Sequence, residues 1–254
     1  MGGKWIVVLV SGSDIEKSLK EGFIRLGVQK PDKKIVIKPN LSSCLPYPHT
    51  VPAETVDAII RLLRGFGRGI IIAEGSSEVE TAQAFKKLGY LRVARVHGTQ
   101  LIDLNRDVRI EEERAEAYRL KKLKIPRTLM NSYIISVSVL KKTSYFLSAS
   151  LKNMLGAVTK VIKCHEIGLD ECVVDVNLYL KPSLAVIDCR KTLMDDEVRS
   201  TNSIIVSADP VAADSIAAKL MGMEPNDVRY LTLAQEKGLG MADLRGIEVI
   251  RINC

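Results

Sequence analysis

Three polar side chains of the kinds that bind an anion follow one short strand-like run. Lys38 offers a positive charge, and Asn40 and Ser42 offer an amide and a hydroxyl group. The run Ile35–Ile37 is apolar and β-branched, as in a buried strand, and Pro39 ends it because proline has no N–H to give to a ladder. Ligands of open α/β sheets bind beyond the carboxyl ends of the strands. The sequence therefore predicts a site for a small anion at this strand end.

Lys152 and Asn153 form a second candidate for anion binding. The spacing of apolar residues predicts a helix over residues 146–163. If the helix is taken over Leu151–Lys163, where its apolar stripe lies, both residues fall in its first turn, where free backbone N–H groups already favour a negative charge. The alternative is a solvent-exposed lysine face on an amphipathic helix, which we favour for Lys160 and Lys163.

Cys164 and His165 come directly after this predicted helix. Histidine side chains titrate near neutral pH, so His165 could act as a general base or bind a metal. A histidine at a helix end can instead hydrogen-bond to free carbonyl groups, and this alternative stays open. Cys164 next to a basic helix end could be a reactive thiol, although a buried and unreactive cysteine is the more common case.

A carboxylate and a hydroxyl group follow a third strand-like run, at residues 69–73. Glu74 would lie at the tip of this strand and Ser76 at the start of the next helix. Glu74 could move a proton, whereas Ser76 could either bind a substrate or simply cap the helix.

Asp209 and Asp214 are candidates for binding a metal or holding a lysine. Asp209 is also well placed to cap the helix that follows it. Asp214 is surrounded by apolar and small residues, which predicts that it is buried and needs a cationic or hydrogen-bonding partner. Lys38, Lys141 or Lys152 would serve as that partner.

Strand-like and helix-like segments alternate along the chain, which is typical of βαβ units. We therefore expect an α/β fold with a mainly parallel sheet flanked by helices, as a single domain over residues 1–254 in which lobes 1–105 and 130–254 could enclose a cleft. Strands are expected at 5–10, 34–38, 69–73, 101–104, 132–140, 184–188, 204–208 and, at an edge, 247–252; helices at 15–26, 51–66, 78–88, 146–163, 169–180, 210–221 and 227–236; and a β-hairpin or a surface excursion at 107–124.

The composition is that of an ordinary globular protein of 254 residues, with 46% hydrophobic and 26% charged residues. No apolar run reaches about 18 residues and no signal peptide is apparent, so we expect a cytoplasmic protein without a membrane partner. The net charge of +7 is compatible with nucleic-acid binding, but the basic residues are scattered and only 5% of residues are aromatic, which argues against it. The five cysteines include no C-x-x-C pair, so no iron–sulfur cluster is expected within this chain.

Several short motifs together resemble the family called domain of unknown function 362, over about residues 35–250. The family is uncharacterised, so the resemblance implies no reaction; some of its members carry a ferredoxin-like iron–sulfur module, and this sequence has none. The motifs are Val36-Ile37-Lys38-Pro39-Asn40-Leu41, Ala73-Glu74-Gly75-Ser76, Ser150-Leu151-Lys152-Asn153-Met154-Leu155-Gly156, His165, Asp209-Pro210-Val211-Ala212-Ala213-Asp214 and Gly238-Leu239-Gly240.

The sequence departs from the family pattern in two places. The family tends to have a lysine followed shortly by a histidine after the strand at 133–140, whereas this chain has Lys141 and Lys142 without a histidine. The family also tends to have a glycine-rich loop after the strand that ends at Asp188, whereas residues 189–194, expected here as a loop, contain no glycine. A pocket that depends on either feature would be altered, and a loss of activity in this chain is compatible with that change.

We therefore expect an enzyme, or a former enzyme, that binds a small carboxylate or phosphate in a cleft lined by lysine and asparagine. A divalent metal and a homo-oligomer are compatible with the sequence; the alternatives are an iron–sulfur or metal-handling accessory protein, a basic nucleic-acid-binding protein, and a purely structural protein. The candidate residues are His165, Lys38 and Glu74 for catalysis, Asn40, Ser42, Ser76, Lys141, Lys152 and Asn153 for substrate binding, and Asp209 and Asp214 for a metal.

Overall fold

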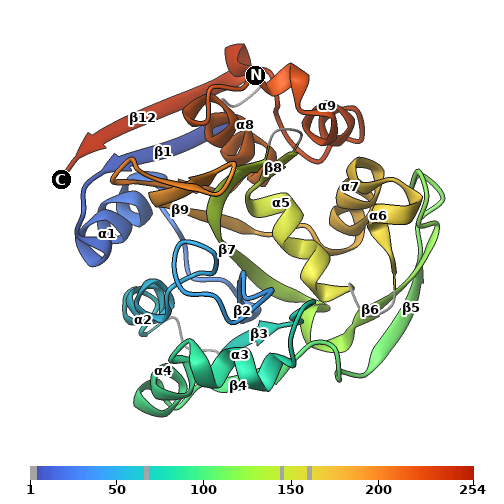
Figure 1. Ribbon diagram of the computed structural model, residues 1–254, viewed down its shortest axis with the longest axis horizontal. Coiled ribbons are helices and arrows are strands. Elements are labelled where there is room, and N and C mark those ends of the chain that lie inside the picture. The colour runs from blue at the N-terminus through green and yellow to red at the C-terminus, as the bar shows by residue number, and fades with distance from the viewer. Residues whose placement is uncertain (1–4, 66–68, 144–145, 159–161) are drawn as a thin grey trace.

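A ten-stranded mixed sheet forms the centre of the computed structural model, which describes residues 5–65, 69–143, 146–158 and 162–254 (Figure 1). The neighbouring strands from β9 to β4 are parallel, and β11 runs antiparallel to β9 and to β1. This arrangement confirms the predicted α/β fold with a mainly parallel sheet. In spatial order the strands are β12 (Ile247–Asn253), β1 (Trp5–Ser11), β11 (Ser203–Ser207), β9 (Leu184–Met194), β7 (Ser132–Thr143), β2 (Lys34–Pro39), β3 (Ile70–Glu74) and β4 (Gln100–Asp103), while β8 (Phe146–Ser148) pairs with β7 and β10 (Glu197–Ser200) with β9.

Successive residues of the central strands point into two different cores. Ile35 and Ile37 of β2 pack in one core, and Val36 packs in the other. A strand that is buried on both faces needs apolar side chains at successive positions, which explains its continuous apolar run. The first core lies under α1 (Ile15–Leu26), α2 (Ala53–Leu62), α3 (Thr81–Lys87) and α4 (Tyr90–His97), and the second under α5 (Ser150–Asn153), α6 (Cys164–Ile167), α7 (Leu169–Leu180), α8 (Pro210–Leu220) and α9 (Arg229–Glu236).

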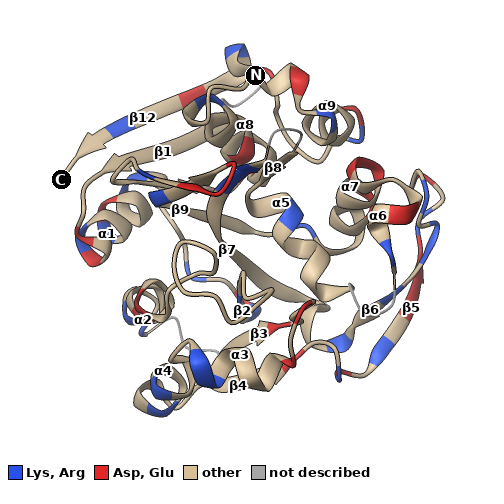
Figure 2. Cartoon of the chain, in the orientation of Figure 1, with Lys and Arg blue, Asp and Glu red and all other residues tan. Residues whose placement is uncertain are grey.

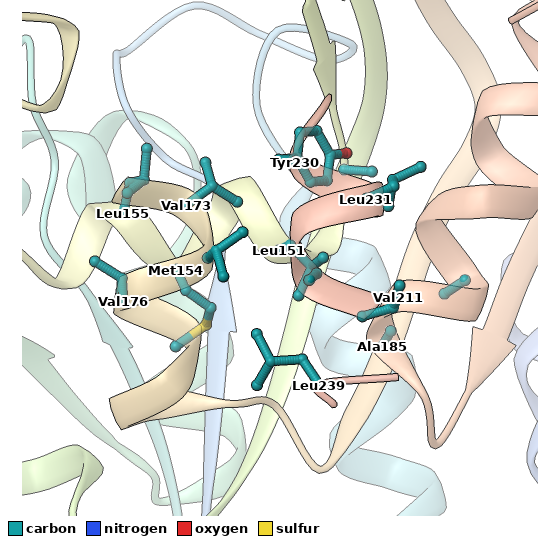
Figure 3. Packing of buried hydrophobic residues seen from close by; sticks show 14 of the residues in the cluster. Leu151, Met154, Leu155, Val173, Val176, Ala185, Val211, Tyr230, Leu231 and Leu239 are labelled. Atoms are coloured by element: carbon teal, nitrogen blue, oxygen red, sulfur yellow. The ribbon is translucent and has the colours of Figure 1, made fainter. Parts of the chain in front are cut away.

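The second core anchors the short segment that carries Lys152 and Asn153. Leu151 is fully buried and lies between Val173 of α7 and Leu231 of α9 (Figure 3). Burial of a leucine at such a position stabilises a fold by roughly 2–5 kcal/mol relative to alanine. The polar residues of this segment are therefore held by its apolar neighbours.

Residues 146–163 do not form one helix, so that prediction is wrong. The segment begins as β8, which pairs with the end of β7, continues as the four-residue α5, and then forms a 3₁₀ turn over Met154–Ala157. The described apolar residues of this segment pack in or against the second core along the broken path, as they would along one face of a continuous helix. Their spacing therefore does not distinguish the two structures. Residues 159–161, which include the predicted surface lysine Lys160, lie outside the described residues.

Residues 189–194 are strand rather than loop, which corrects a second expectation. β9 continues to Met194 and forms a hairpin with β10. Asp195 and Asp196 make the turn with positive φ angles of 48° and 67°, so the hairpin needs no glycine.

The region at 107–124 contains the predicted hairpin, formed by β5 (Arg109–Glu113) and β6 (Lys122–Pro126). Asp175 of α7 fixes the chain between these strands, because its carboxylate accepts hydrogen bonds from the backbone N–H groups of Tyr118, Arg119 and Leu120. β12 is an edge strand, as predicted.

The sheet is continuous across the region where the sequence allowed a division into lobes. β1, from the first part of the chain, pairs with β11 and β12 from the last part, and β7 lies between β2 and β9. Within the residues that the structure describes, no helix has both the length and the apolar character needed to cross a bilayer. Basic and acidic residues are mixed along α1 and β5 (Figure 2).

Candidate functional site

A pocket of about 500 Å³ opens beyond the carboxyl ends of β2, β3 and β7. This is the edge of the sheet at which the sequence predicts a site. Its walls combine lysine, asparagine, serine and glutamate side chains with a few apolar ones. The lining residues are Asn40, Ser42, Glu74, Gly75, Ser77, Glu78, Ser138, Val139, Lys141, Ser148, Ala149, Lys152, Asn153, Leu155, Gly156, Ile162, Lys163, Cys164, His165 and Glu166.

A buried ion pair lies at the base of this pocket. The Nζ of Lys38 donates to both carboxylate oxygens of Glu74, at 2.8 and 3.0 Å, and to Oδ1 of Asn153 at 3.1 Å. Lys38 is fully buried, and these three bonds use all the N–H donors of its ammonium group. Burial lowers the pKa of Lys38, and the charge and hydrogen bonds of Glu74 act in the opposite direction.

Glu74 has no acceptor position to spare. Besides its two bonds from Lys38, its carboxylate accepts hydrogen bonds from the backbone N–H groups of Leu41, at 3.2 Å, and Gly75, at 2.7 Å. Four donors satisfy a carboxylate that is almost completely buried. Lys38 and Glu74 therefore form a fully hydrogen-bonded pair, and the catalytic roles predicted for them stay predictions.

Asn153 joins the helical segment to the sheet beneath it. Its Nδ2 lies 3.0 Å from both the carbonyl oxygen of Lys38 and Oγ of Ser136. Its oxygen accepts from Lys38, so one amide contacts both β2 and β7. Asn153 therefore lines the pocket and also fixes its floor.

Two glycines allow the chain to pass close to the ion pair. A Cβ atom on Gly156 would lie 2.5 Å from Oε1 of Glu74 and 2.8 Å from Nζ of Lys38. A Cβ atom on Gly75 would collide with the carbonyl oxygen of Gly156. The glycines in these two motifs are thus explained by close packing over the buried charges.

Two further lysines lie on the wall of the pocket. The Nζ of Lys141 donates to Oδ1 of Asn40 at 2.9 Å and to the carbonyl oxygen of His49 at 2.5 Å. The Nζ of Lys152 donates to Oγ of Ser148 at 2.9 Å. Among the described residues, neither ammonium group has a carboxylate within 4.0 Å.

Both of these lysines have lowered pKa values. Burial is the main cause for each, and the nearby charge of Lys152 lowers the pKa of Lys141 further, to about 8, while Glu78 opposes this shift. Lys152 also lies 4.7 Å from the centre of the Phe146 ring, which partly compensates its charge. The wall therefore holds two mutually repelling cations whose hydrogen-bond acceptors are neutral.

His165 lies at the rim of the pocket, on the exposed side of the short α6. Its neighbours Lys163 and Glu166 form an exposed ion pair at 3.0 Å. Cys164 is buried and hydrogen-bonds to Cys172, which lowers the pKa of the Cys164 thiol. Within the described part of the chain, no three His, Cys, Asp or Glu side chains are grouped so that they could hold a metal ion.

The predicted serines have different positions. Ser42 lines the pocket. Ser76 is fully buried, and its hydroxyl donates to the carbonyl oxygen of Leu41 at 2.6 Å. Ser77, the next residue along the chain, lines the pocket instead.

Asp209 is a helix cap in the structure and is not part of the pocket lining. Its carboxylate accepts from the N–H groups of Val211 and Ala212 at the start of α8, and from that of Met241. Gly240 lies against it, where a Cβ atom would collide with the carboxylate. This packing accounts for two of the sequence motifs, and the proposed metal role of Asp209 stays a prediction.

Asp214 caps α5 and is buried, as the sequence predicts, but its partners among the described residues are N–H and hydroxyl groups rather than Lys38, Lys141 or Lys152. Its oxygens accept from the N–H groups of Ser150, at 2.8 Å, and Leu151, at 3.0 Å, and from the hydroxyl of Tyr230 at 3.1 Å. Burial raises the pKa of Asp214 to about 7. The N–H groups that would favour an anion near Lys152 are therefore already occupied by this carboxylate, and its own metal role stays a prediction.

A buried network that the sequence did not predict holds the loop after β2. Arg190 forms an ion pair with Asp188 at 2.8 Å, and Asp188 also accepts from the hydroxyl groups of Tyr47 and Thr55, each at 3.0 Å. Tyr47 thereby fixes the loop that contains His49, whose carbonyl oxygen accepts a hydrogen bond from Lys141. Arg190 occupies the place where the family tends to have glycines.

Several other lining residues were also absent from the candidates drawn from the sequence, among them three serines and a glutamate. Ser77 and Glu78 belong to the turn after β3, and Ser148 belongs to β8. Ser138 carried a usable signal, because Ser136 and Ser138 alternate with apolar residues and so share one face of the strand.

The fold and the pocket define a mainly parallel α/β protein with a lysine-lined site at the carboxyl ends of its strands. Residues 35–219 match the family described as Domain of unknown function (DUF362), and the chain belongs to this family. The matched span contains every residue that lines the pocket. A search of curated proteins and a search of solved structures each returned no match.

Proposed function

We propose that the chain is an enzyme, or a former enzyme, that binds a small carboxylate or phosphate in this pocket. The observation that carries the proposal is the pair formed by Lys141 and Lys152, two largely buried cations that face one cavity without a carboxylate partner among the described residues. A buried charge without a counter-charge is costly, and an anionic ligand would compensate both lysines.

The remaining lining residues suit a small polar ligand. A volume of about 500 Å³ is within the range of metabolite pockets. Ser42, Ser77 and Ser138 offer hydroxyl groups, and Asn40 offers an amide. His165 at the rim is the group best suited to exchange a proton with a ligand, because its side chain is exposed and lies at the entrance.

The proposal is tested by measuring thermal stabilisation and calorimetric binding with a panel of small carboxylates and inorganic phosphate. We expect at least one anion to stabilise the protein, because a ligand that binds only the folded state raises its stability. Lys152→Gln should weaken this binding by about tenfold or more, the loss of one charge-assisted hydrogen bond.

Lys20→Gln is the matched control, because it removes one positive charge from the exposed face of α1, outside the pocket. It should bind the same anions as the unmodified chain. Equal weakening in both variants, or no stabilisation by any member of the panel, would contradict the proposal.

A further inference from the structure

Lys141 and Lys38 differ in how many hydrogen-bonding positions of their amino groups are already used by described residues. Lys38 is fully buried and is absent from the pocket lining, and it donates its three N–H groups to Glu74 and Asn153. Lys141 lines the pocket, and its Nζ has two hydrogen-bond acceptors, Asn40 and the carbonyl oxygen of His49. Among the described residues, its third tetrahedral position has no hydrogen-bond partner. In the neutral amine the two N–H groups satisfy both acceptors, and the lone pair takes that third position.

A second residue in the pocket also lacks a partner. Oγ of Ser138 is buried and makes no hydrogen bond to any described residue, and Ser138 lines the same pocket as Lys141. The ladder between β7 and β9 is irregular between Val139 and Lys141. Such a bulge changes the direction of the residues that follow it, which allows Ser138 and Lys141, three positions apart, to reach one cavity. A buried hydroxyl without a partner is costly, and this one faces the pocket, where it is available to an oxygen atom of a ligand.

The surroundings of Lys141 favour the uncharged, nucleophilic form. It is mostly buried, and the charge of Lys152 opposes a second positive charge beside it. Its pKa of about 8 gives it, at pH 8, on the order of 100-fold more free amine than a lysine at its usual pKa. Burial and an adjacent cation together are a known way to activate a lysine.

We infer that Lys141 is a nucleophile that forms an imine with a small carbonyl compound, whose anionic group is held by Lys152 and whose carbonyl oxygen is met by Ser138. The inference rests on the proposed function, because it adds a carbonyl group to the small anion already proposed as ligand. Imine formation from an amine and a carbonyl needs no oxidant, reductant or metal.

The step balances with water as the only by-product. The lone pair of Nζ attacks the carbonyl carbon, and the π electrons move to oxygen. A proton passes from nitrogen to that oxygen to give a carbinolamine. The hydroxyl oxygen of the carbinolamine then takes a proton from solvent and leaves as water, while the nitrogen lone pair forms the C=N bond. The protonated imine that results returns one proton to solvent when it becomes the neutral imine. Ser138 can donate a hydrogen bond to the oxygen at each stage.

The test is reductive trapping of the full chain at pH 8. The protein is incubated with cyanoborohydride and either pyruvate or dihydroxyacetone phosphate, one carrying a carboxylate and the other a phosphate. We expect one reduced adduct for each chain with at least one of these compounds, and peptide mapping should place it on Lys141. The site assignment uses the unmodified sequence, so it does not depend on a variant that folds.

Two variants sharpen the test. Lys141→Arg carries a permanent charge and cannot form an imine, so it should lose the adduct. Lys20→Arg should give the same amount of reduced adduct on Lys141 as the unmodified chain does. Far-UV circular dichroism and thermal unfolding establish that each variant is folded.

The outcomes separate this inference from the proposed function. If small carboxylates or phosphates bind but no lysine is trapped, or if the adducts are spread over surface lysines, the inference fails and the proposed function stands. If neither binding nor trapping is seen with any compound, both fail. A single adduct at Lys152 in place of Lys141 also overturns the inference.

Discussion

The Nζ of Lys38 lies 2.8 and 3.0 Å from the two carboxylate oxygens of Glu74, and neither side chain is more than 2% exposed. A buried pair of this kind costs desolvation energy that its own attraction only partly returns. Here the remaining donors and acceptors are satisfied by Asn153 and by the backbone of Leu41 and Gly75. The pair therefore joins β2, β3 and α5 at one point, directly beneath the pocket.

Removal of one partner of this ion pair should be far more damaging than removal of both. Lys38→Met leaves the Glu74 carboxylate buried without its counter-charge, and we expect it to lower the free energy of unfolding by roughly 3–5 kcal/mol. The double variant Lys38→Met with Glu74→Leu should recover a substantial part of that loss. Urea unfolding measures both values.

The exposed pair of Lys122 and Glu113 is the control for this prediction. Its atoms are 2.6 Å apart, and both side chains are 64% exposed. Lys122→Met should change the free energy of unfolding much less than Lys38→Met does, because water already solvates both charges. A loss in Lys38→Met no larger than this would show that the buried pair does not stabilise the floor of the pocket.

Gly156→Ala should disturb the floor of the pocket without changing any charge. The new Cβ would lie 2.5 Å from Oε1 of Glu74 and 2.8 Å from Nζ of Lys38, so the chain or the ion pair must move. We expect a loss of about 1–3 kcal/mol in the free energy of unfolding. Gly69→Ala is the matched control, because among the described residues beyond its chain neighbours no atom lies within 4 Å of its new Cβ. Equal stability of the two variants would contradict this account of Gly156.

The strands that position the site could be predicted from the sequence because their signals are local. The apolar run Ile35–Ile37 and the proline that ends it place Lys38 and Asn40 at a strand end, and a parallel sheet brings neighbouring strand ends together. Glu74, Asn40 and Lys141 thus reach one pocket as expected from their place in the chain.

The segment at 146–163 could not be predicted because its path depends on a distant residue. Asp214 caps Ser150 from 64 positions further along the chain, and apolar spacing does not report such a contact. The same limit applies to Ser76 and Ser77, since which of two adjacent serines faces the pocket depends on turn geometry. Hydrogen bonds between distant segments decide these details of the site.

Asp214 should make the stability of the protein depend on pH in the weakly acidic range. Burial raises its pKa from 3.8 to about 7, so between these values the folded state binds more protons than the unfolded state. Its contribution to the free energy of unfolding therefore decreases as pH rises from about 4 to 7. Asp214→Asn, which cannot titrate, should show a shallower decrease over this interval in urea unfolding at several pH values.

Asp243→Asn serves as the control for that measurement. Asp243 is held by Arg245, and this interaction lowers the pKa of Asp243 to about 2. Its effect on the free energy of unfolding is therefore confined to pH values below about 4, and it has the opposite sign. It should leave the slope between pH 4 and 7 unchanged. A slope in Asp214→Asn identical to that of the unmodified chain would show that Asp214 does not titrate in this range.

Anion binding in the pocket should weaken as pH rises through about 8. Lys141 binds an anion best as an ammonium group, and its pKa of about 8 means that the free protein loses this charge above that pH. A lysine with its usual pKa of 10.5 would keep its charge to a much higher pH, so weakening near pH 8 identifies a lysine with a lowered pKa. Calorimetry with inorganic phosphate or propionate at pH 7 and pH 9.5 measures the difference.

Lys141→Arg distinguishes this titration from a general effect of alkaline pH. The guanidinium group stays charged at both pH values, so the variant should hold the anion at pH 9.5 better than the unmodified chain does. Because arginine forms no imine, this variant would combine stronger binding at high pH with the absence of a trapped adduct. If the unmodified chain and Lys141→Arg lose affinity in parallel between pH 7 and 9.5, the lysine that controls binding is not Lys141.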